Sequence, residues 1–322
     1  MSLWKHNHAF LRLLRTLTMM VLFGVLGIIT VLIDLVTLPI TLLGDPHSTF
    51  CQTVNVFVTK LATAPFVNVK IRGLEKFRTG ETYCIVANHA SALDAFIMGL
   101  LGERDFRGII KRSLLFYPIL GQLFYFGGFI TVDRKSAESR TSSRLKTRAL
   151  LENGVSVLYF PEGSRSAGPM LPFRLGAFKT AIEAGVPVLP ITMSGVRAAL
   201  PLKGFPSLGW HTVEVTIHDP LPTDGLSPAA SPEGSSEPSD CELLGRRARA
   251  VIQSRLRPVD YYAGSHWEVD EEKFMAAWTG PESLAAANDA VGADWKRANK
   301  VALSRADGPK VAATEGGKPK TE

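Results

Sequence analysis

Cysteine is scarce in this chain, and several other patterns are missing altogether. Only Cys51, Cys84 and Cys241 occur among 322 residues, too far apart for a disulfide framework or a CxxC motif, which fits a reducing compartment. The seven histidines are scattered and no H-E-x-x-H motif occurs, so we expect neither a metal nor another cofactor. No G-x-S-x-G elbow is present either, which disfavours a serine hydrolase or thioesterase.

The composition indicates a folded protein with a basic surface. Apolar residues make up 46% of the chain and charged residues 20%, which favours a packed core over disorder. The net charge of +6 favours an anionic partner such as a phosphate or a membrane, although a solvated basic surface explains it equally. Basic residues are scattered without a zinc-finger, RRM or basic-zipper pattern, so nucleic acid is not an expected partner.

Charge is almost absent from residues 16–43, where Asp34 is the single charged side chain. A spanning helix needs about 20 apolar residues, so 16–33 approaches the required length. Arg12 and Arg15 predict a cytoplasmic N-terminus. A cleaved signal peptide is the alternative, but no small-x-small cleavage site follows the apolar run.

Beyond residue 65, short runs rich in valine, isoleucine and aromatic residues alternate with helix candidates. The predicted strands are 67–73, 83–88, 106–112, 129–133, 155–160, 186–191 and 212–217. The predicted helices are 92–101, 136–152 and 176–184. This alternation predicts an α/β domain at 65–220 with a largely parallel central sheet flanked by helices.

The remaining chain has a different composition. Residues 221–240 are rich in proline, serine and glycine, as in a linker. A helical extension is predicted at 241–307, and its first helix carries arginines on a face more typical of solvent than of anionic lipid. The polar tail at 308–322 is predicted to be disordered.

Residues 83–94 place a histidine and an aspartate at a spacing suited to general-base chemistry. A predicted strand ends at His89, and Ser91 is placed to cap the next helix in a capping box with Asp94. Side chains of a first helical turn point back towards the N-terminus, so the Asp94 carboxylate can reach the His89 ring. A carboxylate on one ring nitrogen leaves the other free as a base. A capping aspartate beside an incidental histidine is the alternative.

Two arginines follow predicted strands, in the runs FPEGSRS (160–166) and GGFITVDR (127–134). Ligands of open α/β sheets bind at the carboxyl ends of strands. Glycine allows close backbone approach, hydroxyls donate, and the guanidinium of Arg165 or Arg134 suits phosphate. A surface ion pair is the alternative for Arg165. Together with the His-Asp pair, these arginines predict an anion-binding cleft beside a base.

Five segments of this chain resemble, in order, those of the glycerophospholipid acyltransferase family, which includes the 1-acyl-sn-glycerol-3-phosphate acyltransferases. NHASALD (88–94) is similar to the H-x4-D block of that family, and KRSLLFYPILG (111–121) to its K-x-x-L-x-x-x-P-x-x-G stretch. GFITVDR (128–134) resembles its glycine-to-arginine block, PEGSRS (161–166) its E-G-T-R-S block, and VPVLPI (186–191) its V-P-V-x-P block. The resemblance covers about residues 65–200.

The resemblance implies roles for particular residues. His89 would deprotonate the hydroxyl of the acceptor, which then attacks an acyl thioester, while Asp94 orients His89. The phosphate and glycerol of the acceptor would be held by a substrate-binding set: Lys111, Arg134, Glu162, Gly163, Ser164 and Arg165. The implied reaction acylates the sn-2 hydroxyl of lysophosphatidic acid to give phosphatidic acid, with acyl-CoA or acyl carrier protein as co-substrate.

Three departures from the family pattern leave the catalytic groups intact. Ser164 replaces threonine, Thr131 stands where an apolar residue such as phenylalanine is common, and Arg174-Leu175 replaces a more basic pair. Other acceptors remain open: a lyso-ornithine lipid, another lysophospholipid or glycerol 3-phosphate. A non-catalytic membrane lipid-binding protein is the alternative from a different class.

The implied chemistry also decides between two arrangements of the N-terminal segment. A single span would place the rest of the chain outside, whereas Asp34 and Pro39 divide the stretch into halves too short to cross a bilayer. Because the acyl donor is cytosolic, we predict a one-leaflet hairpin within a membrane-anchoring segment at 1–64. The expected location is a membrane, the bacterial inner membrane, with the catalytic domain facing the cytoplasm and in contact with membrane phospholipids.

Overall fold

The computed structural model describes most of residues 67–261, together with scattered helical positions between residues 14 and 35. The gaps within the main range are 102–105, 118–120, 122–123, 126, 134, 167–168, 201–210 and 232–236. Three predicted features therefore lie outside the described residues: Arg134, the tail at 308–322, and all but the start of the 241–307 extension. So does most of the predicted 1–64 anchor. No helix among the described residues has both the length and the hydropathy needed to cross a bilayer.

The described chain forms a seven-stranded sheet in the order β1-β7-β6-β2-β5-β3-β4. Its strands are β1 (Val67–Arg72), β2 (Cys84–Ala87), β3 (Phe106–Lys111), β4 (Ile130–Val132), β5 (Ser156–Tyr159), β6 (Val188–Ser194) and β7 (His211–Ile217). Neighbouring strands are parallel except β6 and β7. Five strands thus share one direction while β1 and β7 oppose them, which confirms the largely parallel sheet.

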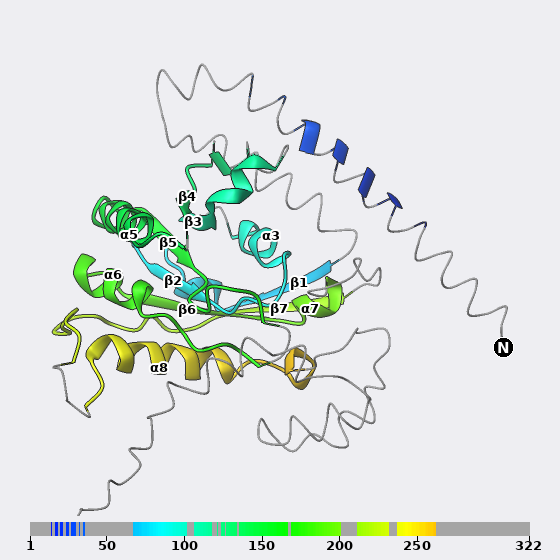
Figure 1. Ribbon diagram of the computed structural model, residues 1–322. Coiled ribbons are helices and arrows are strands. Elements are labelled where there is room, and N and C mark those ends of the chain that lie inside the picture. Colours follow the sequence, from blue (N-terminus) through cyan, green and yellow to red (C-terminus); the bar gives the residue numbers. More distant parts are fainter. Residues whose placement is uncertain are drawn as a thin grey trace, which may run out of the picture.

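Helices cover both faces of this sheet, and Figure 1 shows α3 and α8 on opposite faces. The helices are α3 (Asp94–Gly99), α5 (Ala137–Glu152), α6 (Gly176–Ala184), α7 (Val196–Ala199) and α8 (Asp240–Gln253). Short 3-10 turns are η1 (Leu74–Lys76), η3 (Arg112–Phe116) and η4 (Pro258–Tyr261). The predicted α/β class is confirmed for this part of the chain.

The central strand β2 shows why its residues form a strand between two helical layers. All four of its residues are buried, and successive side chains of a strand point to opposite faces. Ile85 and Ala87 pack in one core cluster with α3 and α7, whereas Cys84 and Val86 pack in the other with α6 and α8. A strand buried on both faces has the continuous apolar sequence of a parallel sheet interior.

Helix α8 shares the hydrophobic core of the sheet. Its apolar face lies in the same cluster as α6 and β6, through Cys241, Leu244, Ala248 and Ile252. The predicted linker contributes Leu221, which is buried and bridges to Val188. The side chains of Arg246 and Arg247 are exposed, as expected for a solvated face. The division of the chain at residues 220 and 240 stays a prediction.

Candidate active site

Three of the predicted site residues lie at or just after the ends of parallel strands. His89 follows β2, Glu162 follows β5, and Lys111 is the last residue of β3. Strands β2, β5 and β3 are consecutive neighbours in the sheet. Because these strands run in the same direction, their carboxyl ends lie on one edge, which is where open α/β sheets bind ligands.

The predicted pairing of His89 with Asp94 is present in the structure. Nδ1 of His89 lies 2.8 Å from Oδ2 of Asp94, and the Asp94 side chain is fully buried while the His89 side chain is 18% exposed. The same Oδ2 accepts hydrogen bonds from the backbone N–H groups of Ala90 and Ser91, at 2.7 and 2.9 Å. A proton on Nδ1 therefore points at the carboxylate, and Nε2 is left with its lone pair as a possible base.

The predicted capping box at Ser91 is wrong, although the Asp94 half of the expected pairing is present. Helix α3 begins at Asp94, and its N-cap residue is Leu93 instead of Ser91. The Ser91 hydroxyl instead accepts from the Leu93 N–H at 3.2 Å and donates to the Leu200 carbonyl at 2.7 Å. The Ser91 hydroxyl is therefore bonded to the residue after α7 and does not cap α3. The backbone N–H of Ser91 donates to the Asp94 carboxylate instead.

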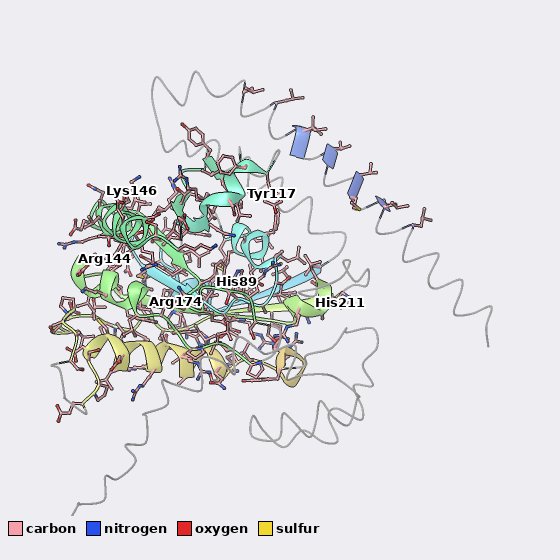
Figure 2. The ribbon with its side chains drawn as sticks, in the orientation of Figure 1. His89, Tyr117, Arg144, Lys146, Arg174 and His211 are labelled. Carbon is pink, nitrogen blue, oxygen red and sulfur yellow. The ribbon has the colours of Figure 1, made fainter. Side chains whose placement is uncertain are left out.

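Three further contacts fix His89 itself, which is labelled near the centre of Figure 2. Its ring stacks on Phe160 with a centroid distance of 4.3 Å and an interplanar angle of 21°. The backbone N–H of His89 donates to Glu162 Oε1 at 2.6 Å, and its backbone carbonyl accepts from the Ser166 N–H at 2.8 Å. The loop after β5 thus contacts both the ring and the backbone of His89.

Asn88 ties the same loop to β6, a role that the sequence did not reveal. Its Nδ2 donates to the Met193 carbonyl at 2.9 Å, and its Oδ1 accepts from the Met193 N–H at 2.8 Å. The side-chain amide thus continues the parallel hydrogen bonding between β2 and β6 beyond the last strand residue. Its position next to His89 in NHASALD is the signal that could have found it.

Glu162, which was predicted to hold the acceptor, contacts the backbone of His89 in the structure. Its side chain is fully buried, and its two oxygens accept from the N–H groups of His89 and Leu171, at 2.6 and 2.8 Å. Burial raises the pKa of Glu162 to about 8, although these two N–H groups and the charge of Arg197 act in the opposite direction. Glu162 is therefore placed to position His89, and its contact with the acceptor stays a prediction.

The raised pKa of Glu162 gives a testable pH dependence of stability. Between its ordinary value of 4.5 and about 8, the folded protein holds a proton that the unfolded chain releases, so stability falls as pH rises through this window. In Glu162→Gln this contribution is absent. Relative to that variant, we expect the wild-type free energy of unfolding to fall by up to about 5 kcal/mol across the window. Urea unfolding of both proteins at several pH values measures it; parallel curves would contradict it.

The side chain of Arg174 packs against the turn after Glu162. Gly163 has φ +68°, and a Cβ there would lie 2.7 Å from Nε of Arg174, so only glycine admits this guanidinium against the turn. The buried Ser164 hydroxyl oxygen has no hydrogen-bond partner within the described part of the chain, and Arg165 is exposed. Gly163, Ser164 and Arg165 lie in the loop between Glu162 and Ser166, both of which bond the backbone of His89, and their role in substrate binding stays a prediction.

Arg174 lies against the Gly163 turn, and its only signal in the sequence was the altered basic pair before Gly176. Its backbone N–H donates to the Pro161 carbonyl at 2.9 Å. This hydrogen bond places the segment before α6 alongside the Gly163 turn. Figure 2 labels Arg174 and His89 in neighbouring loops. Lys111 is exposed at the end of β3, further along the same edge.

Other candidate chemistries find little support in the described residues. Within them, no cluster of three or more His, Cys, Asp or Glu side chains could hold a metal ion. Burial raises the pKa of the Cys84 thiol well above its ordinary range, so this cysteine is a packing residue rather than a nucleophile.

A histidine–aspartate pair lies beside an arginine-flanked turn at the carboxyl edge of an α/β sheet. This arrangement fits the class of general-base enzymes that act on anionic substrates. Comparison with known proteins agrees with this class. The model of the Acyltransferase family matches residues 68–194. The chain is 32% identical over 241 residues to a 1-acyl-sn-glycerol-3-phosphate acyltransferase of Chlamydomonas reinhardtii, covering 74% of this chain and 68% of that protein. The chain belongs to the Acyltransferase family.

Two further comparisons extend this result. The chain is 31% identical over 214 residues to 1-acyl-sn-glycerol-3-phosphate acyltransferase BAT2, chloroplastic, of Brassica napus, covering 65% of this chain and 61% of that protein. It thus spans about three fifths of the length of that relative. The crystal structure of the LPA acyltransferase PlsC from Thermotoga maritima matches with a TM-score of 0.57 and 22% identity, covering 76% of this chain and 95% of that one. That likeness shows a shared fold.

Proposed function

We propose that this protein transfers a fatty acyl group from a thioester donor to the sn-2 hydroxyl of lysophosphatidic acid, giving phosphatidic acid. The observation that carries this proposal is the 2.8 Å contact between His89 Nδ1 and a buried Asp94 carboxylate. The names of the relatives from Chlamydomonas and Brassica support the same acceptor. The donor is acyl-CoA or acyl carrier protein.

The geometry supports direct transfer with His89 as base. Nε2 removes the proton of the acceptor hydroxyl as its oxygen attacks the thioester carbonyl. The C–S bond then breaks, and the imidazolium returns the proton to the departing thiolate. The Asp94 carboxylate stabilises the imidazolium and keeps the ring oriented, as the acid of a catalytic triad does. No covalent acyl-enzyme is required.

The turn beside His89 is suited to the phosphate of the acceptor. We assign this role to Arg165 and Arg174, with the Ser164 hydroxyl as a further donor, because guanidinium groups bind phosphate oxygens in pairs. Gly163 lets the ligand approach the backbone. Arg134 and Lys111 are proposed to contribute to the same anion site.

Substitution of the two arginines tests this assignment. Arg165→Ala and Arg174→Ala each remove a charge-assisted hydrogen bond, so we expect KM for lysophosphatidic acid to rise by about 10- to 50-fold with kcat little changed. Acylation of a monoacylglycerol, which has no phosphate, should be equally slow in all variants. Arg246→Ala, at an exposed position of α8, is the control. A fall in kcat with an unchanged KM would contradict the assignment.

An exposed aromatic surface lies beyond the end of β3, on the site's edge of the sheet. Phe116, Tyr117 and Tyr125 are 79%, 58% and 72% exposed, and the neighbouring Lys111 and Arg112 are exposed as well. Aromatic side chains concentrate at membrane interfaces, and basic groups are attracted to anionic lipid. We propose that this surface faces the membrane that supplies the acceptor. The N-terminal anchor and the cytoplasmic side of the bacterial inner membrane belong to the same proposal.

An assay of the purified full-length protein tests the function as a whole. Incubation with radiolabelled acyl-CoA, or acyl carrier protein, and lysophosphatidic acid should yield phosphatidic acid. A panel with a lyso-ornithine lipid, other lysophospholipids and glycerol 3-phosphate identifies the preferred acceptor. Net thioester hydrolysis without transfer would indicate a thioesterase, and neither reaction would indicate a lipid-binding protein; both results would overturn the proposal.

A further inference from the structure

The last described turn of the chain docks onto α7. The buried Asp260 side chain accepts from the Ser194 hydroxyl at 2.5 Å, the Gly195 N–H at 2.6 Å and the Arg257 N–H at 2.9 Å. The Asp260 carbonyl accepts from Nη2 of Arg197 at 2.7 Å. A turn more than sixty residues downstream is thus held against the segment where β6 passes into α7.

Gly195 shows how closely this turn is fitted. Its φ is +83°, and a Cβ there would lie 2.2 Å from Nη2 of Arg257 and 2.7 Å from the Thr212 carbonyl oxygen. Nε of Arg257 donates to the Ser194 hydroxyl at 2.7 Å. The turn before η4 therefore occupies the space that a glycine leaves open beside α7.

At its other end, α7 contacts the loop that carries the catalytic pair. The carbonyl of Leu200, the residue after α7, accepts the Ser91 hydroxyl at 2.7 Å. The N–H of that same Ser91 donates to the Asp94 carboxylate. Helix α7 therefore connects the C-terminal turn to the residues that fix Asp94.

Arg197 is the buried cation in this connection, with 8% of its surface exposed. Burial lowers the pKa of its guanidinium, while the carboxylates of Asp260, Glu162 and Asp94 act in the opposite direction. These three groups come from η4, from the loop after β5 and from α3. Two of them are the buried acids that hold His89. Burial raises the pKa of Glu162, the charge of Asp94 raises it further, and the charge of Arg197 lowers it.

We propose that Arg197, held in place by the C-terminal turn at Asp260, is a positioning residue for acyl transfer. Nη2 of Arg197 holds the C-terminal turn against α7, and Leu200 at the end of α7 accepts the Ser91 hydroxyl. Because the Ser91 N–H donates to Asp94, this connection keeps the Asp94 carboxylate aligned with the His89 ring. This inference depends on the function proposed above and adds a requirement for residues 257–261.

Variants of Arg197 separate its charge from its volume. In Arg197→Met the side chain is similar in length but neutral, and we expect kcat to fall by about 10- to 100-fold with KM for both substrates within about twofold of wild type. Arg197→Lys restores a charge and should recover a large part of the loss.

Asp260→Asn provides a second test that leaves Arg197 itself in place. It weakens the docking of the turn, so we expect the same loss in kcat without a rise in KM. Arg246→Met, on the exposed face of α8, is the matched control and should behave as wild type. Circular dichroism and thermal melting identify any variant that does not fold; if the Met variant fails, Arg197→Lys and Asp260→Asn are compared instead.

The outcomes distinguish this inference from the function on which it rests. If the wild-type protein showed no acyl transfer, the proposed function itself would be overturned. If the wild type is active and a folded Arg197→Met or Asp260→Asn variant keeps full kcat, only the role of Arg197 would be overturned. Equal losses in the Lys and Met variants, or a loss confined to KM, would overturn the same role.

Discussion

Replacing His89 with alanine should reduce kcat for acyl transfer by about 10²- to 10⁴-fold, the range expected when a general base is lost. The substitution removes the nitrogen that takes the hydroxyl proton. It leaves the buried Asp94 carboxylate with the backbone N–H groups of Ala90 and Ser91 as hydrogen-bond donors. Because the His89 ring is partly exposed, its loss should not unfold the protein.

Initial rates with lysophosphatidic acid and saturating donor measure this effect, with melting temperature as the check on folding. His211→Ala is the matched control, since His211 is the first residue of β7, which β6 separates from β2 in the sheet; both histidines are labelled in Figure 2. We expect the control to retain at least half of the wild-type rate, on the order of the effects seen at surface sites. Near-normal turnover by His89→Ala would show that another group is the base.

Asp94→Asn should have an effect of similar size for a different reason. The amide is nearly the same size, but it is neutral and presents an N–H₂ group in place of one oxygen. If that group faces His89, Nδ1 must accept, and the proton moves to Nε2, where it blocks the base. A comparable change in a catalytic triad costs about 10⁴-fold in kcat, so we expect a loss of about 10³- to 10⁴-fold with little change in KM.

Steady-state kinetics of Asp94→Asn, with Asp219→Asn as the control, measures this prediction. Asp219 carries an exposed carboxylate that pairs with Lys76 at 3.0 Å, and such surface pairs contribute little. A loss in Asp94→Asn that appears only in KM would place Asp94 in acceptor binding. Wild-type kcat would show that the carboxylate is dispensable.

Local sequence signals predicted the sheet and two helix starts in detail. Helix α6 occupies 176–184 as expected, and Ser136 caps α5 by accepting from the Ser139 N–H. All seven expected strands are present within one to three residues of their predicted bounds. Runs of β-branched residues and polar caps act through neighbours in sequence, so a single chain is sufficient to reveal them.

The contacts that support the catalytic pair were not predicted, because they join distant parts of the chain. Glu162 reaches the His89 N–H across 73 residues, and Asn88 meets Met193 across 105. The Ser91 hydroxyl bonds Leu200 across 109 residues, which is why its expected role as a helix cap failed. Each of these polar groups has more than one possible partner, and only the packing of β6 and α7 beside β2 decides between them.

The His89–Asp94 contact itself was predictable because it is local. Five residues separate the two side chains, and both the strand end and the following helix were evident in sequence. The fixed orientation of the ring was not, since Phe160 and the Glu162 carboxylate approach it from the loop after β5. The sequence was thus sufficient to predict the His89–Asp94 contact, and the tertiary structure shows how the two side chains are held.

A double-mutant cycle of His89→Ala and Asp94→Asn tests most directly whether the two residues act as one unit. If Asp94 acts only through the His89 ring, the double variant should be as slow as His89→Ala alone, because effects within one catalytic unit are not additive. Single-turnover acyl transfer to lysophosphatidic acid gives the four rate constants. Losses that multiply in the double variant would contradict the account, because Asp94 would then act independently of His89.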